Sequence, residues 1–299
     1  MYPTRALAAL GFLGLLALGG CTRGETTKDP AVGAKEESAP HVVASFYPAA
    51  FAAEQVAPAG TRVFDLTPPG AEPHDLELTA TDLRGLLAAD LVIYVGGMQP
   101  SLNEALSARR GPVLDLLTVP GLDLIRRGGS RSPIDPHFWL DPRRYALVSR
   151  AIARQLGDER RADSLVRELE RLDAELERGL AHCTNRKLVA THAAFGYIAD
   201  RYGLEQIALA GLEPEAEPAP RDLAALINTA RAADTKAVFV EPLVSRSAAE
   251  LVAREIGAAV IELNPLEVLT REHASQESTY FEVMRANLDA LRQGLECSQ

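Results

Sequence analysis

The stretch ERRADSLVRELERLDAELERGLAH (residues 159–182) decides how this chain is organised. Leucines recur in it at steps of four and three residues, with glutamate and arginine on the other positions, which is the pattern of a helix with one apolar face. A continuous helix of this length would measure about 36 Å. A coiled-coil partner helix could cover such a stripe, but a single short leucine seam more often packs against its own chain.

A second helical pattern over 142–156 precedes this stretch directly, with no strand between the two. On both sides of the pair, the chain alternates between short apolar runs and amphipathic segments. Most of the runs are continuously apolar, as in parallel strands that are buried on both faces. We expect strands at VVASF (42–46), RVFDL (62–66), LVIYV (91–95), PVLDL (112–116), KLVAT (187–191), QIALA (206–210), AVFV (237–240) and AVIEL (259–263), and helices between them at 80–87, 222–233 and 248–256.

This alternation predicts an α/β fold in which parallel sheets carry helices on both faces. Two helix starts are marked by their residues. Thr79 with Asp82 three positions later approximates a capping box, and Asp141 before Pro142 is a typical N-cap followed by proline. The interruption in the middle divides the body into an N-terminal α/β lobe (41–142), a helical linker with one long backbone helix (143–186), and a C-terminal α/β lobe (187–299).

The first residues indicate export. Arg5 supplies a positive charge, and the apolar run over 6–18 is too short to span a bilayer as a stable helix. The run ends in LGGC, which resembles a bacterial lipobox, so residues 1–20 read as a lipoprotein signal peptide that is cleaved before a lipidated Cys21. The alternative is an ordinary secretory peptide with a chance cysteine. Both place the mature protein outside the cytoplasm, and the lipid would anchor it to a membrane.

Residues 21–40 are polar and lack periodicity, which predicts a flexible tether. The whole chain carries 31 basic and 41 acidic side chains, for a net charge of −10. Removal of the signal peptide takes away one arginine and brings the net charge to −11. An acidic chain argues against nucleic-acid binding, which requires a basic face. It is compatible with a cation as ligand.

Cys183 and Cys297 are the cysteines that remain besides the lipidation candidate. In an oxidising compartment they most simply form a disulfide with each other. The bridge would close a loop of over a hundred residues, worth up to about 4–5 kcal/mol in the chain-entropy view. Zinc ligation by the two thiolates is the competing interpretation, although neither cysteine belongs to a C-x-x-C pair.

Three of the six histidines lie where a ligand site of an α/β protein would form, beyond the carboxyl ends of parallel strands. His192 follows KLVAT directly, His74 follows the Pro/Gly-rich turn after 62–66, and His137 precedes the helix that starts at 142. Glu241 and Asn264 follow two further strands. Neutral imidazole is the commonest metal ligand, and three of them leave a fourth position open. The sequence therefore predicts a divalent-metal site between the lobes with His74, His137 and His192 as ligands.

Five motifs resemble those of one family, the metal-binding lipoproteins of ABC importers for zinc and manganese. They are PGAEPHD (69–75), DPHFWLDP (135–142), THAAFGYIADRYGL (191–204), GLEPEAEPAPRDL (211–223) and FVEP (239–242). The resemblance covers nearly the whole body. It implies two Rossmann-like lobes bridged by one backbone helix, a metal held between them, and delivery of that metal to a membrane permease. It also implies a monomeric binding protein and not an enzyme.

The chain departs from the family pattern at the fourth ligand. The family's last strand commonly ends in Leu-Asp-Pro-Leu, whereas Asn264 stands at the aspartate position here. Asn264 offers only a neutral carbonyl oxygen, so we expect it, or a water, to complete the site. Glu241 is expected to accept a hydrogen bond from an imidazole N–H, with direct ligation as the alternative. The His/Asp-rich loop of many zinc members is also missing, and residues 126–134 read RRGGSRSPI.

Three imidazoles with at most one neutral oxygen favour zinc, because manganese prefers more oxygen ligands. Two other classes of protein remain as alternatives. A zinc metallohydrolase could use the same three histidines with Glu241 as general base, but no nucleophile elbow and no H-E-x-x-H motif is present. A surface adhesin could use the metal for stability alone.

Overall fold

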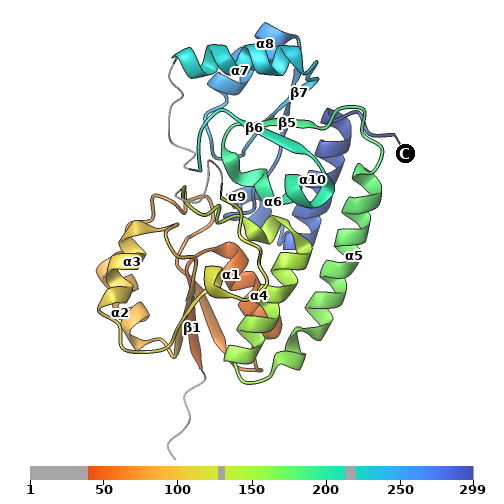
Figure 1. Ribbon diagram of the computed structural model, residues 1–299. Coiled ribbons are helices and arrows are strands. Elements are labelled where there is room, and N and C mark those ends of the chain that lie inside the picture. The colour runs from red at the N-terminus through yellow and green to blue at the C-terminus, as the bar shows by residue number, and fades with distance from the viewer. Residues whose placement is uncertain (1–39, 127–131, 213–219, 299) are drawn as a thin grey trace, which may run out of the picture. The chain divides into compact units, whose positions relative to one another are not determined.

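Each of the eight apolar runs forms a strand, and the strands make two four-stranded parallel sheets (Figure 1). The computed structural model describes residues 40–126, 132–212 and 220–298. The first sheet has the order β2-β1-β3-β4 and the second the order β6-β5-β7-β8, so the two lobes repeat one topology. The strands are β1 (His41–Ala44), β2 (Arg62–Asp65), β3 (Leu91–Tyr94), β4 (Val113–Asp115), β5 (Lys187–Ala190), β6 (Glu205–Ala208), β7 (Ala237–Val240) and β8 (Ala259–Glu262). The predicted α/β fold is confirmed.

The strands differ in burial according to their place in the sheet. Val42 and Val43 of the central strand β1 are fully buried between β2 and β3. At the edge, Phe64 of β2 is 49% exposed. Continuous apolar runs therefore mark the central strands, as expected for sheets covered on both faces.

The helices lie around these sheets and begin where their caps indicate. Thr79 and Asp82 form the predicted capping box at the start of α2, and the Asp141 carboxylate accepts the Arg143 amide at the start of α4. The helices around the first sheet are α1 (Tyr47–Val56), α2 (Ala80–Ala88) and α3 (Pro100–Ser107); those that follow in the second half of the chain are α6 (Gly196–Tyr202), α7 (Pro220–Ala232), α8 (Ser247–Ile256), α9 (Arg271–Ser275) and α10 (Tyr280–Gly294).

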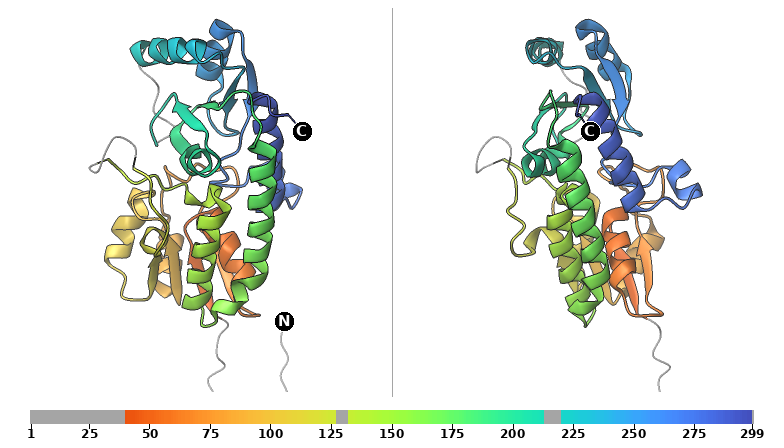
Figure 2. Two further views of the ribbon diagram at one scale, coloured as in Figure 1. Left: turned by 45° about the vertical axis from the view of Figure 1, so that its right-hand side comes forward. Right: turned by 90° about the vertical axis from the view of Figure 1, so that its right-hand side faces the viewer.

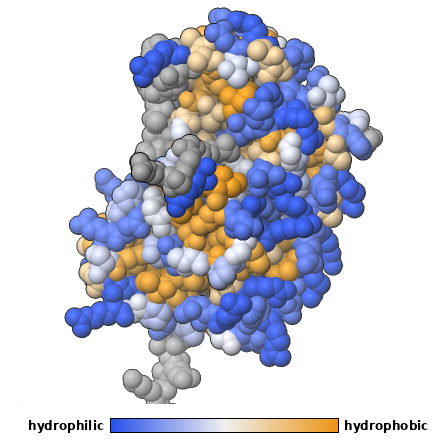
Figure 3. All heavy atoms as spheres, in the orientation of Figure 1, coloured by the Kyte–Doolittle hydropathy of each residue, from blue (hydrophilic) through white to orange (hydrophobic). Residues whose placement is uncertain are grey.

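Two helices connect the sheets: α4 (Pro142–Gln155), which follows the 3-10 turn η2 (Phe138–Leu140), and α5 (Asp163–Leu180). The helix predicted over 159–182 is shorter than expected, because the Asp158 carboxylate accepts the Arg160 amide and starts a separate 3-10 turn. The five leucines of the predicted stripe are nevertheless all at most 3% exposed. The two helices run side by side along the first lobe, and α5 extends further to the second lobe (Figure 2). The side of the molecule on which α5 lies is largely hydrophilic (Figure 3). The leucine stripe packs against its own chain.

The last helix, α10, also contacts both lobes. At its start, Tyr280 and Phe281 pack on Phe51 of α1, with ring centroids 5.7 and 6.0 Å apart. At its end, a Cβ on Gly294 would lie 2.5 Å from the Phe239 ring of the second sheet, so only glycine permits this approach. The lobes are thus joined by α10 as well as by the predicted backbone helix.

The segments after α5 and after α10 are tied together by Cys183 and Cys297, whose sulfur atoms are 1.98 Å apart. The structure contains this pair as the cysteine count predicts. Within the described residues, no helix combines the length and the apolar character needed to cross a bilayer. The predicted signal peptide, Cys21 and the tether up to residue 39 lie outside the described residues.

Candidate metal centre

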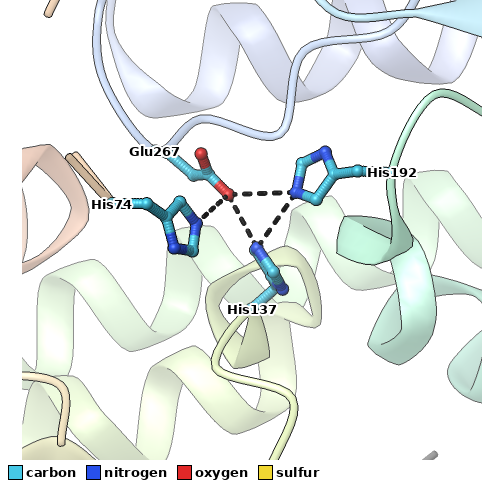
Figure 4. A group of neighbouring side chains, drawn as sticks. All are labelled: His74, His137, His192 and Glu267. Atoms are coloured by element: carbon cyan, nitrogen blue, oxygen red, sulfur yellow. Dashed lines mark hydrogen bonds and ion pairs between the residues drawn. The ribbon is translucent and has the colours of Figure 1, made fainter. Parts of the chain in front are cut away.

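Four side chains from four separate segments converge between the lobes: His74, His137, His192 and Glu267 (Figure 4). One nitrogen or carboxylate oxygen of each lies within 4.8 Å of those of the other three. The side chains of His137 and His192 are fully buried, and those of Glu267 and His74 are 4% and 9% exposed. The three histidines that the sequence singled out thus meet at one point, and a carboxylate joins them.

His74 comes from the loop between β2 and α2 of the first lobe. Gly70 has a φ of 81° and turns this loop towards the second lobe, where its amide donates to the Leu269 carbonyl at 2.9 Å. The Glu72 carboxylate accepts the His74 amide at 3.2 Å. These two bonds direct the His74 ring to the centre.

His137 and His192 are each oriented by a carboxylate on the nitrogen that points away from the centre. Asp135 Oδ1 lies 2.7 Å from His137 Nδ1 and also accepts the His137 amide at 3.0 Å. Glu241 Oε2 lies 2.6 Å from His192 Nδ1, while its Oε1 accepts the Thr191 hydroxyl at 2.6 Å. A carboxylate behind an imidazole fixes the ring and leaves Nε2 available to a metal. In both residues Nε2 faces the centre.

Glu267 reaches the histidines because the loop after β8 turns sharply. Leu266 has a φ of 58°, and its amide donates to Asn264 Oδ1 at 2.8 Å. Asn287 fixes the Asn264 backbone by accepting its N–H at 2.9 Å and donating to its carbonyl at 2.7 Å. Trp139 Nε1 donates to the Pro265 carbonyl at 2.8 Å. This left-handed turn brings the glutamate side chain inward.

Three of the distances between the converging atoms suit a tetrahedral ion. Zn–N bonds of about 2.0–2.1 Å place neighbouring ligand atoms about 3.3–3.4 Å apart. Glu267 Oε1 lies 3.4 Å from His74 Nε2 and 3.5 Å from His192 Nε2, and the Nε2 atoms of His137 and His192 are 3.5 Å apart. A fourth pair, His137 Nε2 and Glu267 Oε1, forms a 2.6 Å hydrogen bond. A metal would replace the shared proton and widen this one contact by about 0.7 Å.

At the fourth position of the centre, the structure differs from the sequence-based expectation. Asn264 or a water was expected to supply the fourth ligand, with Glu241 as the alternative. The Asn264 side-chain oxygen instead accepts the Leu266 amide, and Glu267 is the side chain that points among the histidines. Glu241 lies behind His192, in the position expected of an acceptor for an imidazole N–H. Asp135 and Glu267 were not anticipated. The DPH motif contained a signal for Asp135, because an aspartate side chain commonly accepts a hydrogen bond from the backbone amide two residues further along the chain, here that of His137.

The charges of the centre favour protonated histidines when no metal is bound. Burial by itself would lower the pKa of His137, but the hydrogen bonds and charges of Asp135 and Glu267 raise it above its ordinary value. Burial also opposes a charged His192, whereas the charges of Glu241 and Glu267 raise its pKa to about 10. Burial would raise the pKa of Glu267, yet hydrogen bonds from the three histidines hold it well below its usual range.

Comparison with known families agrees with this geometry. The family model of zinc-uptake complex component A, periplasmic (ZnuA), matches residues 42–294, which is nearly all of the described structure. The chain belongs to the ZnuA family. Members of this family are metal-binding transport receptors and not enzymes, in agreement with the expectation from the motifs.

Two relatives illustrate the family. The high-affinity zinc uptake system protein ZnuA of Bacillus subtilis is 30% identical over 280 residues, which covers 85% of this chain and 87% of the relative. The zinc-binding lipoprotein AdcA of Streptococcus pneumoniae is 31% identical over 276 residues, covering 85% of this chain. The match spans 55% of AdcA, so this chain corresponds to about half the length of that relative.

Solved structures show the same fold. The Zn(II)-bound ZnuA-like domain of S. pneumoniae AdcA superposes with a TM-score of 0.73 at 29% identity, over 86% of this chain and 99% of that domain. The laminin-binding protein Lmb of Streptococcus agalactiae, described as having adhesin and metal-transporting activity, gives 0.75 at 28% identity, over 86% and 99%. TroA of Treponema pallidum, at 24% identity, shares the fold with a TM-score of 0.75 over 86% and 99%.

Proposed function

We propose that this chain binds Zn²⁺ as cargo outside the cytoplasm and delivers it to the permease of an ABC importer. His74, His137 and His192 would bind the ion through Nε2, and Glu267 through Oε1. The observation that carries the proposal is the convergence of these four atoms, three of whose mutual distances already match a zinc tetrahedron. The relatives named for zinc uptake and zinc binding support the same cargo.

The composition of the centre favours zinc over manganese. Three imidazole nitrogens and one carboxylate oxygen make a compact four-ligand set, whereas manganese prefers more oxygen atoms and a higher coordination number. A glutamate supplies the negative charge that Asn264 lacks, so the divalent ion is partly neutralised without a second carboxylate ligand.

The proposal extends to the place of the protein in the cell. Residues 1–20 would be removed as a signal peptide, and a lipid on Cys21 would anchor the body to a membrane through the tether. An oxidising compartment outside the cytoplasm permits the pairing of Cys183 with Cys297 to persist as a disulfide. The body would act there as a monomer beside the permease.

The experiment that tests the function compares two histidine variants. His137→Ala removes a buried residue of the centre, and His182→Ala removes an exposed histidine that lies outside it. We expect the purified His137→Ala protein to lose stoichiometric zinc in metal analysis and to keep the circular dichroism of the parent. His182→Ala should bind zinc as the parent does. Parent-like zinc binding by folded His137→Ala would contradict the assignment.

A transport measurement separates cargo from a merely stabilising metal. A strain that carries only the His137→Ala form should grow poorly in zinc-depleted medium and recover when zinc is added. A surface adhesin or a zinc hydrolase would show no such zinc-dependent growth. Normal growth of that strain in depleted medium would exclude the transport role.

A further inference from the structure

Tyr197 connects the two segments that carry His192 and His137. It lies in α6, which begins four residues after His192, and its side chain is fully buried. Its hydroxyl oxygen lies 2.8 Å from the Asp135 carbonyl oxygen and 3.1 Å from the Ile125 amide nitrogen. Both of these partners belong to the segment before η2, in the other half of the chain. One side chain thus spans from the second lobe to the His137 loop.

The direction of these hydrogen bonds follows from their partners. A backbone amide can only donate, so the tyrosine oxygen accepts from Ile125, and its own hydrogen is given to the Asp135 carbonyl. Burial raises the pKa of Tyr197 to about 12, which keeps the hydroxyl protonated at any working pH. A phenylalanine in this place would remove the hydrogen bonds that the hydroxyl makes with the Asp135 carbonyl and the Ile125 amide.

The ring of Tyr197 is held as firmly as its hydroxyl. The Arg144 guanidinium lies over it, 5.0 Å from the ring centroid. Arg144 is itself fixed by Asp141 at 2.6 Å and by Asp200 at 3.1 Å, and its Nε donates to the Leu122 carbonyl at 2.7 Å. Tyr197 therefore has little freedom to follow a displaced loop, and the Asp135 carbonyl is held relative to α6.

We propose that Tyr197 is a positioning residue of the metal centre, which keeps His137 at the correct distance from His192 and thereby slows release of the ion. The inference rests on the proposed function. Tyr197 holds the Asp135 carbonyl, and the Asp135 carboxylate holds His137 Nδ1 at 2.7 Å. Because His192 lies just before α6, these bonds join the two ligand segments and maintain their Nε2 atoms 3.5 Å apart.

The effect should be seen in dissociation of the ion. Tyr197→Phe removes two neutral hydrogen bonds, to the Asp135 carbonyl and from the Ile125 amide, and keeps all four ligand residues. Of the two bonds, the one to the Asp135 carbonyl holds the His137 loop. Loss of such a bond changes an equilibrium by about fivefold to tenfold. Since changes within one binding site act mostly on the dissociation rate, zinc should leave the variant about fivefold to tenfold faster, with little change in association.

Tyr202→Phe is the matched control. Tyr202 lies in the same helix, is 8% exposed, and donates its hydroxyl hydrogen to Asp173 Oδ1 at 3.1 Å on α5. The substitution therefore removes a tyrosine hydroxyl hydrogen bond, here to a carboxylate on α5, without touching the His137 loop. Zinc-loaded parent and variants are mixed with excess chelator in a stopped-flow instrument, and denaturant unfolding of each metal-free protein is measured in parallel.

We expect faster zinc dissociation in Tyr197→Phe alone, whatever the two substitutions cost in unfolding free energy. The absorption bands of bound Co²⁺ should also change in Tyr197→Phe and not in Tyr202→Phe, because only the first shifts a ligand. Parent-like dissociation and Co²⁺ bands in Tyr197→Phe, or equal acceleration in both variants, would overturn the inference. Such a result leaves the proposed function intact, since that function is tested separately by the zinc binding and the growth of the His137→Ala form.

Discussion

The zinc affinity of this protein should rise steeply with pH well above the range in which an ordinary histidine titrates. In the metal-free centre, the pKa of His192 is raised to about 10, with burial opposing and the charges of Glu241 and Glu267 producing the increase. Zinc can bind His192 only after the proton on Nε2 has left. Each zinc bound near neutral pH must therefore displace at least this proton.

The size of this pH effect on zinc affinity follows from how far the pKa of His192 is raised. At pH 7, three units below that pKa, removing the proton costs about 4 kcal/mol, which weakens apparent binding about a thousandfold relative to the fully deprotonated centre. The apparent Kd should fall about tenfold for each pH unit between 7 and 10. His137, whose pKa is also raised by its two carboxylate partners, adds to the slope. A histidine with a pKa of about 6.5 would give a nearly constant affinity above pH 7.5.

Two measurements check this expectation. Competition with a chelator of known proton linkage gives the affinity at several pH values from 6.5 to 9. Calorimetry in two buffers of different protonation enthalpy gives the number of protons released per zinc, which we expect to lie between one and two at pH 7. An affinity that stays constant above pH 7.5, with no proton release, would contradict the raised pKa of His192. Glu241→Gln should reduce the proton release, because it removes the charge that contributes most to the raised pKa of His192.

Three further predictions concern the centre and its support. Glu267→Gln should weaken zinc binding by more than the roughly 10–100-fold that is typical when a residue hydrogen-bonded to a metal ligand is lost. Asn264→Ala loses the hydrogen bond to the Leu266 amide and should weaken zinc binding about fivefold. Calorimetric zinc titrations compare the two variants, and equal losses of zinc affinity would argue against Glu267 as a ligand. Leu172→Ala, at a fully buried site on α5, should lower the free energy of unfolding by about 2–5 kcal/mol without changing the zinc stoichiometry. Leu147→Ala, at a 39% exposed site, should lower the free energy of unfolding much less in the same denaturant titration. Cys297→Ser opens a bridge between residues 114 positions apart and should lower unfolding stability by up to about 4–5 kcal/mol; a chemical denaturation midpoint unaffected by the change would show that the bridge does not form.

Local patterns were sufficient to predict the sheets and the connection between them. Buried parallel strands produce apolar runs that end at the sheet edge, so strand ends located His192 and Glu241 correctly at one side of the second sheet. The stripe of leucines predicted the buried face of α5. Its start was misplaced, because a 3-10 turn and an α-helix have similar sequence preferences over one turn.

The fourth member of the metal group could not be predicted in the same way. The sequence predicted it at Asn264, the residue that follows the apolar run over 259–263. The carboxylate that faces the histidines lies three residues further, and it points inward because Leu266 takes a left-handed backbone conformation that leucine rarely adopts. That conformation is enforced from outside the loop, by Asn287 on α10 and by Trp139. Such long-range contacts leave no periodicity in the sequence.

Trp139 gives the centre its own optical reporter. It is the only tryptophan of the chain, so excitation of indole samples a single position. Its ring centroid lies 5.3 Å from that of His137, and its Nε1 donates to the carbonyl just before the turn that presents Glu267. A protonated imidazole quenches indole emission, whereas a metal-bound one does not carry that proton. Intrinsic fluorescence should therefore brighten as the ion displaces the proton on His137, and loading can be followed in the unlabelled protein.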